Sequence, residues 1–152
     1  MAKQLEKSGL YEPVKQFSIF LENKVGKMLE IIKLLGDEHI HVVALMTLDT
    51  SDSTILRLVV DDPDGARALF LEHAIAHTET EVLVVELNGA EDVQAVLCFI
   101  LQAEINIHYA YAFLTQPNGK PALGIHLEDI DIAAQALSRG HYNVLGQRDI
   151  SR

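Results

Sequence analysis

The feature that most constrains this chain is that its second half repeats its first. When the sequence is shifted by 65 positions, apolar residues of the first half fall on apolar residues of the second. The matches are Phe17, Ile19 and Phe20 on Val82, Val84 and Val85; Met28, Ile31, Ile32 and Leu35 on Val93, Val96, Leu97 and Ile100; and Ile40 and Val42 on Ile105 and Ile107. Both the helical period of 3.6 and the strand period of 2 survive this shift. Beyond the turn at 117–119 the offset becomes 67, and we infer an internal duplication with one longer hairpin.

Each half has the pattern of a βαββαβ unit. In the first half, alternating or β-rich segments predict strands at 15–21, 40–48, 54–60 and 75–79, and helical spacing predicts helices after 26 and after 62. The sequence therefore predicts an α+β protein of two tandem ferredoxin-like βαββαβ units, with antiparallel sheets and helices packed on one face. The expected domains are 14–79 and 80–150. A unit of about 70 residues is marginal as a lone core. The sheet face without helices and the sheet edges need covering, either by the other unit or by a partner chain, and we expect a homodimer.

The charge of the chain excludes several classes of partner. Only 12 Lys and Arg face 22 Asp and Glu, which gives a formal net charge of −10. Nucleic acid and anionic membrane surfaces are bound mainly by Lys and Arg, so neither is an expected partner. No stretch of 18 uninterrupted apolar residues and no apolar leader is present. With a single cysteine, the sequence predicts a cytoplasmic protein without disulfides.

Two segments resemble the ACT domain family. Residues 21–29, LENKVGKML, are similar to the E-N-[RK]-P-G-x-L loop of ACT domains, and residues 105–113, INIHYAYAF, are similar to a strand of stand-alone tandem ACT proteins. ACT domains bind amino acids at domain interfaces and regulate amino-acid metabolism. Some chains of this length and loop are regulatory subunits of acetolactate synthase. The resemblance covers roughly residues 14–150 and implies an amino acid or similar metabolite as ligand, with an amino-acid biosynthetic enzyme as possible partner.

The loop that follows the first strand is the expected ligand site. A loop entering a helix offers free backbone N–H groups and the positive end of the helix dipole to a ligand carboxylate. A glycine allows close approach, and an asparagine amide both donates and accepts. The candidates in the first unit are Asn23, Lys24, Val25, Gly26, Lys27 and Met28. The candidates in the second unit are Asn88 and Gly89, and the resemblance adds the strand positions His41 and Asn106.

The two copies of this loop depart from the family pattern. Val25 stands where the family usually has proline, and Glu91 occupies the position of Gly26 in the second unit. Carboxylates there would repel a ligand carboxylate, so we expect at most one class of site, centred on the first loop. Val25, Met28 and Leu45 suggest an apolar pocket wall, which favours branched-chain or aromatic amino acids.

Each candidate also has a structural interpretation. Asn23 could satisfy its own backbone, Asn88 and Gly89 could form only a tight turn, and His41 could be a hydrogen-bonded structural histidine. Three other features have structural explanations: Tyr109 and Tyr111 as an interface or core stripe, Cys98 as a buried thiol, and the pairs Asp61-Asp62 and Glu128-Asp129 as helix N-terminal caps. His73 and His77 are spaced i, i+4, but no third ligand follows at a fixed spacing, so we expect no metal site.

Nothing in the sequence predicts catalysis. It contains no G-x-G-x-x-G, G-x-S-x-G or H-E-x-x-H motif, so we expect neither an enzyme nor a cofactor. The sequence favours a non-catalytic regulator that senses a small metabolite. The alternative is a ligand-free module that only dimerises or bridges other proteins.

Overall fold

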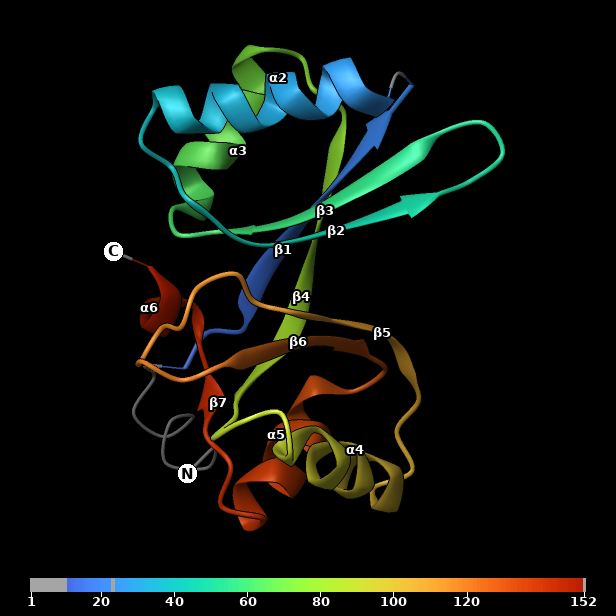
Figure 1. The fold of residues 1–152 in the computed structure, drawn as a ribbon, viewed down its shortest axis with the longest axis vertical. Helices are drawn as coiled ribbons and strands as arrows, with labels where there is room; N and C mark the ends of the chain where they lie inside the picture. The colour runs from blue at the N-terminus through green and yellow to red at the C-terminus, as the bar shows by residue number, and fades with distance from the viewer. Residues whose placement is uncertain (1–10, 23, 152) are drawn as a thin grey trace. The chain divides into compact units, whose positions relative to one another are not determined.

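The computed structural model describes residues 11–22 and 24–151 (Figure 1). Contacts divide these residues into two compact units. The first unit consists of residues 15–80 with residue 151, and the second consists of residues 11–14 together with 81–150. Over the described part of the chain, no helix has both the length and the apolar character that a membrane crossing requires.

The first unit is a four-stranded antiparallel sheet with two helices. Its elements in chain order are β1 (Val14–Leu21), α2 (Lys24–Asp37), β2 (Val42–Asp49), β3 (Thr54–Val60), α3 (Pro63–Glu72) and the start of β4 (His77–Glu86). The strand order is β2-β3-β1-β4. Both helices lie on the same face of this sheet (Figure 1). Between sheet and helices lies a core that includes Phe17, Leu35, Leu56 and Phe70.

The second unit repeats this arrangement. Its elements are the rest of β4, α4 (Asp92–Gln102), β5 (Ile107–Ala112), β6 (Ala122–Leu127), α5 (Ile130–Arg139), β7 (Val144–Leu145) and the short α6 (Gln147–Ile150). The strand order β5-β6-β4-β7 is that of the first unit position for position. The predicted fold class, two ferredoxin-like βαββαβ units, is therefore confirmed. The expected strand at 75–79 overlaps the start of a longer strand, β4, which continues into the second unit.

The duplicated hairpins have the same register. In the first unit Ala44 lies opposite Val59, and in the second Tyr109 lies opposite His126, which corresponds to offsets of 65 and 67. Both hairpins also carry a register shift at equivalent places, between Val42 and Ala44 and between Ile107 and Tyr109. The change of offset at the turn is thus confirmed.

The opening strands follow a different offset from the one predicted. Phe17 lies opposite Leu58, and the residue in the equivalent place opposite Ile125 is Leu83. The structural offset along these strands is therefore 66, and the alignment of Phe17 with Val82 was wrong. Because side chains alternate between faces, an error of one residue exchanges the core face for the other. The turn between strand and helix is one residue shorter in the second unit, and this deletion is invisible when the apolar residues form a continuous run.

Two of the four predicted acidic caps are confirmed. Asp62 accepts a hydrogen bond from the backbone N–H of Gly65, at 3.0 Å, and Asp129 accepts one from Ile132, also at 3.0 Å. Each aspartate satisfies an N–H group at the first turn of its helix. Asp61 and Glu128 bond instead to the residue directly before the neighbouring strand, His41 before β2 and Asn106 before β5.

An ion pair ties α3 to β4 in the first unit. The guanidinium of Arg67 donates to both carboxylate oxygens of Glu79, at 2.7 and 2.6 Å, and also reaches Asp64 at 2.8 Å. The hydrogen bonds from Arg67 lower the pKa of Glu79 below its ordinary value. This two-point contact fixes the helix against the strand that leaves the unit.

All four long helices end in the same way. The second residue after each helix has a positive φ: 58° at His39, 53° at Ala74, 58° at Glu104 and 66° at His141. The following N–H bonds back to a carbonyl of the last turn, for example from Ile40 to Leu35 at 3.0 Å and from Ile75 to Phe70 at 2.8 Å. This is the arrangement in which glycine is usually found, because a side chain is strained there.

We predict that Glu104→Gly stabilises the protein by about 0.5–1 kcal/mol, since it relieves the left-handed strain at a modest cost in unfolded-chain entropy. Urea unfolding followed by circular dichroism measures the change. The matched control is Ala103→Gly, where φ is −81° and the substitution should destabilise. Equal effects of the two substitutions would contradict the explanation.

Candidate functional site

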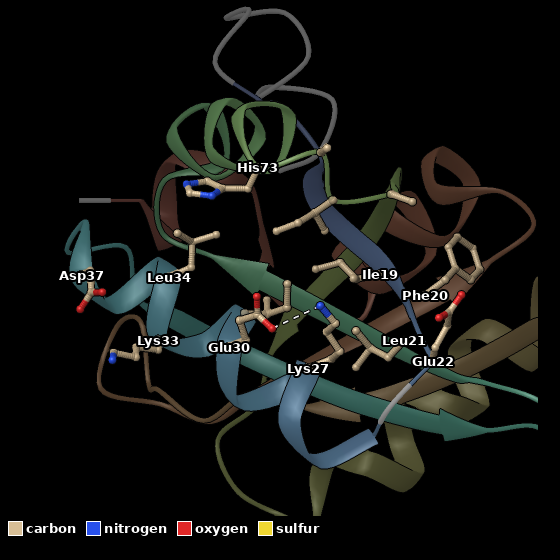
Figure 2. A pocket seen from close by; sticks show the side chains of 14 residues that line it. Ile19, Phe20, Leu21, Glu22, Lys27, Glu30, Lys33, Leu34, Asp37 and His73 are labelled. Atoms are coloured by element: carbon tan, nitrogen blue, oxygen red, sulfur yellow. Dashed lines mark ion pairs between the residues drawn. The ribbon is translucent and has the colours of Figure 1, made fainter.

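A cleft of about 520 Å³ opens in the first unit, between the end of β1, helix α2 and the turn from α3 to β4. Figure 2 shows the side chains that line it. Its floor is apolar and consists of Ile19, Leu21, Ile31, Leu34 and Ile75, together with small residues of the turn. All of these positions belong to residues 15–80, so the cleft lies within one unit.

Charged groups of both signs surround this apolar floor. Lys27 and Glu30, one turn apart on α2, form an ion pair with 3.4 Å between Nζ and Oε2, and both are solvent-exposed (Figure 2). Glu22, Lys33 and Asp37 also line the cleft. An exposed pair of this kind contributes little to stability, so its partners can exchange it for contacts with a ligand. The site can therefore meet a carboxylate and an ammonium group at once.

The equivalent place in the second unit is filled by aromatic rings. Phe99 and Tyr142, the counterparts of Leu34 and Ile75, pack edge to face with 6.1 Å between ring centroids. The ring of Phe99 lies so close to Gly140 that a Cβ there would come within 2.5 Å of it.

The Tyr142 hydroxyl in turn donates to Asp92, the counterpart of Lys27, at 3.4 Å. Burial of the hydroxyl and the nearby Asp92 carboxylate raise the pKa of Tyr142. The two units thus share a scaffold, and at the positions of Leu34 and Ile75 the first unit has the smaller side chains.

The predicted loop residues of the first unit have different fates. Helix α2 begins at Lys24, so Val25 and Gly26 lie in its first turn and the expected loop at 22–26 is shorter than predicted. Lys27 lines the cleft, whereas Met28 packs against the core and Val25 is 78% exposed. Asn23 lies outside the described residues.

In the second unit, Asn88 and Gly89 form a turn closed by its own side chains. The Asp92 carboxylate accepts from the N–H of Asn88 at 2.7 Å, and Lys120 donates to the Asn88 amide oxygen at 3.2 Å. Glu91 folds over Gly89, where a Cβ would lie 2.4 Å from its carboxylate oxygen. The acidic side chains therefore occupy the space above this turn.

His41 and Asn106 are held by carboxylates at equivalent places. His41 donates its N–H to Asp61 at 2.9 Å, and its Nδ1 lies 2.7 Å from the other Asp61 oxygen. Asn106 donates its amide N–H to Glu128 at 2.6 Å. Neither residue lines the cleft. These ties join the start of β2 or β5 to the end of β3 or β6.

Comparison with known proteins identifies the family. The profile of the ACT domain pair family matches residues 12–138. The chain belongs to the ACT domain pair family. A comparison with curated proteins returned no match.

Among solved structures, this ACT domain pair is similar to a protein from Bacteroides thetaiotaomicron. The TM-score is 0.83 and the identity 29%, and the alignment covers 93% of this chain and 98% of that one. The regulatory subunit of aspartate kinase from Thermus thermophilus, in its ligand-free form, has a TM-score of 0.59 and 13% identity, with 85% and 91% covered. The corresponding subunit from Thermus flavus gives 0.55 and 13%, with 86% and 94% covered. At 13% identity these two similarities concern the fold.

Sequence reasoning missed most of the cleft of this ACT domain pair. Leu34, His73 and Ile75 line it, whereas the expected wall residues Val25 and Leu45 do not. The alignment carried a usable signal, because Leu34 and Ile75 are replaced by larger aromatic residues in the repeat. The predicted ligand site included only the loop after the first strand and two strand positions, and the turn after α3 was not part of it.

Three structural interpretations can also be compared with the fold. Cys98 is exposed on α4, so the prediction of a buried thiol was wrong. His77 lies in β4, where it packs against Phe17 and Phe70, so it shares no helical face with His73. Tyr109 and Tyr111 lie on one face of their sheet with rings nearly parallel, as the alternation predicted.

We predict that Asp61→Ala costs about 1–3 kcal/mol of stability, because it leaves the N–H of His41 without its buried acceptor. The equivalent Glu128→Ala in the second unit should cost about 0.5 kcal/mol or less, since Glu128 is exposed. Urea unfolding of the two variants tests the difference. Similar losses in both would show that burial does not set the strength of this tie.

Proposed function

We propose that this ACT domain pair is a non-catalytic regulator that binds an amino acid in the cleft of the first unit. It would act in the cytoplasm on an amino-acid biosynthetic enzyme such as acetolactate synthase. The observation that carries the proposal is a cleft with an apolar floor and charges of both signs at its rim. Membership of the ACT domain pair family and the fold shared with regulatory subunits of aspartate kinase support it.

The chemistry of the cleft matches a zwitterion with an apolar side chain. The ammonium groups of Lys27 and Lys33 suit a ligand carboxylate, and Glu22, Glu30 and Asp37 suit its ammonium group. The apolar floor suits a branched-chain or aromatic side chain. A volume of about 520 Å³ lies within the usual range for small-molecule sites. In this proposal Lys24 and Gly26, in the first turn of α2, complete the site from the loop side, together with Asn23, which precedes them in the sequence.

The second unit serves as scaffold in this proposal. Phe99 and Tyr142 fill the equivalent space, and Glu91 covers Gly89 in the turn. We take residues 14–79 as the ligand-binding domain and residues 80–150 as the domain available for contacts with the regulated enzyme or a second copy.

We predict that one class of amino acid binds with 1:1 stoichiometry and raises the melting temperature, since a ligand of the native state must stabilise it. Isothermal titration of the twenty amino acids measures this directly. Lys27→Gln should weaken binding about tenfold or more, because a charge-assisted contact is lost. Lys120→Gln, outside the cleft, is the matched control.

A second variant separates binding from folding. The triple substitution Leu34→Phe, His73→Gly and Ile75→Tyr copies the second unit and should close the cleft. This variant should fold normally and bind no amino acid. Binding that survives the triple substitution would place the site elsewhere, and silence of the native protein at millimolar ligand would remove amino-acid sensing.

One observation favours the alternative of an assembly module. Helix α4 exposes Leu97, Cys98 and Leu101 along an open groove, and Leu101 is 74% exposed. Asp92 is the only charged residue of this helix. In a chain with a net charge of −10, an uncharged strip lets two copies approach without repulsion.

We predict a homodimer through α4, weakened about a hundredfold by Leu101→Glu because two-fold symmetry removes two leucine contacts at once. Sedimentation equilibrium measures the dissociation constant. Leu71→Glu is the control, since Leu71 on α3 is 69% exposed but does not line the groove. A monomeric native protein, or equal effects of both variants, would contradict the role of α4.

A further inference from the structure

Two histidines meet on the hairpin of the second unit. The Nδ1 atoms of His108 on β5 and His126 on β6 lie 3.0 Å apart, and their ring centroids are separated by 4.9 Å. The ring of Tyr109 stacks on His126, at 4.8 Å and with planes 12° apart. Tyr111 lies next to Tyr109, with ring centroids 6.4 Å apart. The stacked tyrosine holds the His126 ring in one orientation.

A β-bulge brings the two histidines together. The register of β5 and β6 shifts between Ile107 and Tyr109, so His108 is the extra residue between the pairs Ile107–Leu127 and Tyr109–His126. A bulge redirects the side chain of the extra residue, which would otherwise alternate to the other face of the strand pair. Here it directs the His108 ring toward His126.

The bulge itself does not require histidine. The hairpin of the first unit has the same register shift, and the residues at the two equivalent positions are Val43 and Val59. Both valines are buried. The scaffold therefore forms with two apolar side chains at these places, and the histidine pair is an addition that only the second unit carries.

The spacing of the nitrogens suits two ligands of one metal ion. With metal–nitrogen bonds of about 2.0–2.1 Å, a separation of 3.0 Å corresponds to an angle of roughly 90–100° at the metal. That is the angle between neighbouring ligands in octahedral or square-planar coordination, which Ni²⁺ and Cu²⁺ adopt. Tetrahedral Zn²⁺ would need a separation of about 3.3 Å.

We propose that His108 and His126 bind a divalent transition-metal ion such as Cu²⁺ or Ni²⁺. Among the described residues no group of three or more His, Cys, Asp or Glu is placed to hold a metal. The remaining coordination positions therefore belong to water or to a ligand from solution. The strongly negative chain attracts cations to the site. This site is independent of the amino-acid cleft, so its test does not depend on the outcome of the amino-acid binding experiments.

The test uses full-length protein without a polyhistidine tag. Titration with Cu²⁺ or Ni²⁺ should give one ion per chain, and electron paramagnetic resonance of the Cu²⁺ form should show two nitrogen ligands. His108→Val and His126→Val each restore the residue of the first unit, so both variants should fold and lose the site. His39→Asn is the matched control and should keep it, since His39 is exposed and asparagine tolerates its positive φ.

The result that supports the proposal is loss of metal binding in both valine variants with retention in the control. Retention in either valine variant overturns it, because the geometry requires both rings. Absence of binding by the native protein at about 100 µM Ni²⁺ also overturns it, and the pair is then a hydrogen bond between two imidazoles.

Discussion

The pairing of each opening strand with the third strand of its unit determines what the rest of the molecule can do. Phe17 opposite Leu58, and Leu83 opposite Ile125, place alternate side chains on the helix side of each sheet. The two apolar cores follow from this alternation, because the helices cover one face only. So does the position of the cleft, since Ile19 and Leu21 reach its floor from that same face. A slip of one residue would turn these side chains away from the helices.

The fold was predictable from one sequence because the pattern of each half can be checked against the pattern of the other half. A helix or strand period that recurs at the same offset is supported by two stretches of sequence. Strand β3 was predicted with the bounds that the structure has. The caps at Asp62 and Asp129 were predictable because each directly precedes its helix, where a carboxylate can accept from an N–H group of the first turn. The one-residue deletion before α4 was not, since the run VLVV is apolar on both faces and has no period to align.

The site was harder to predict because its residues share no pattern. The cleft of the first unit combines the end of a strand, one face of a helix and a turn far along the chain. Lys27 is one of the residues singled out in the loop, and it lines the cleft. His41 and Asn106 instead bind carboxylates that sequence reasoning had assigned to helix caps. Long-range side-chain pairs of this kind leave no periodic signature, so only the three-dimensional arrangement reveals them.

The path of the chain makes the first unit an insertion within the second. Tyr11 packs on the second core and the carbonyl of Glu12 accepts from the N–H of Gln147 at 2.9 Å, before the chain enters the first unit; it returns along β4. The second unit therefore includes the earliest described residues as well as the last strand. During synthesis its opening segment emerges first and its final strand last. All strands of the first unit can therefore pair before β7, the last strand of the second unit, has been synthesised.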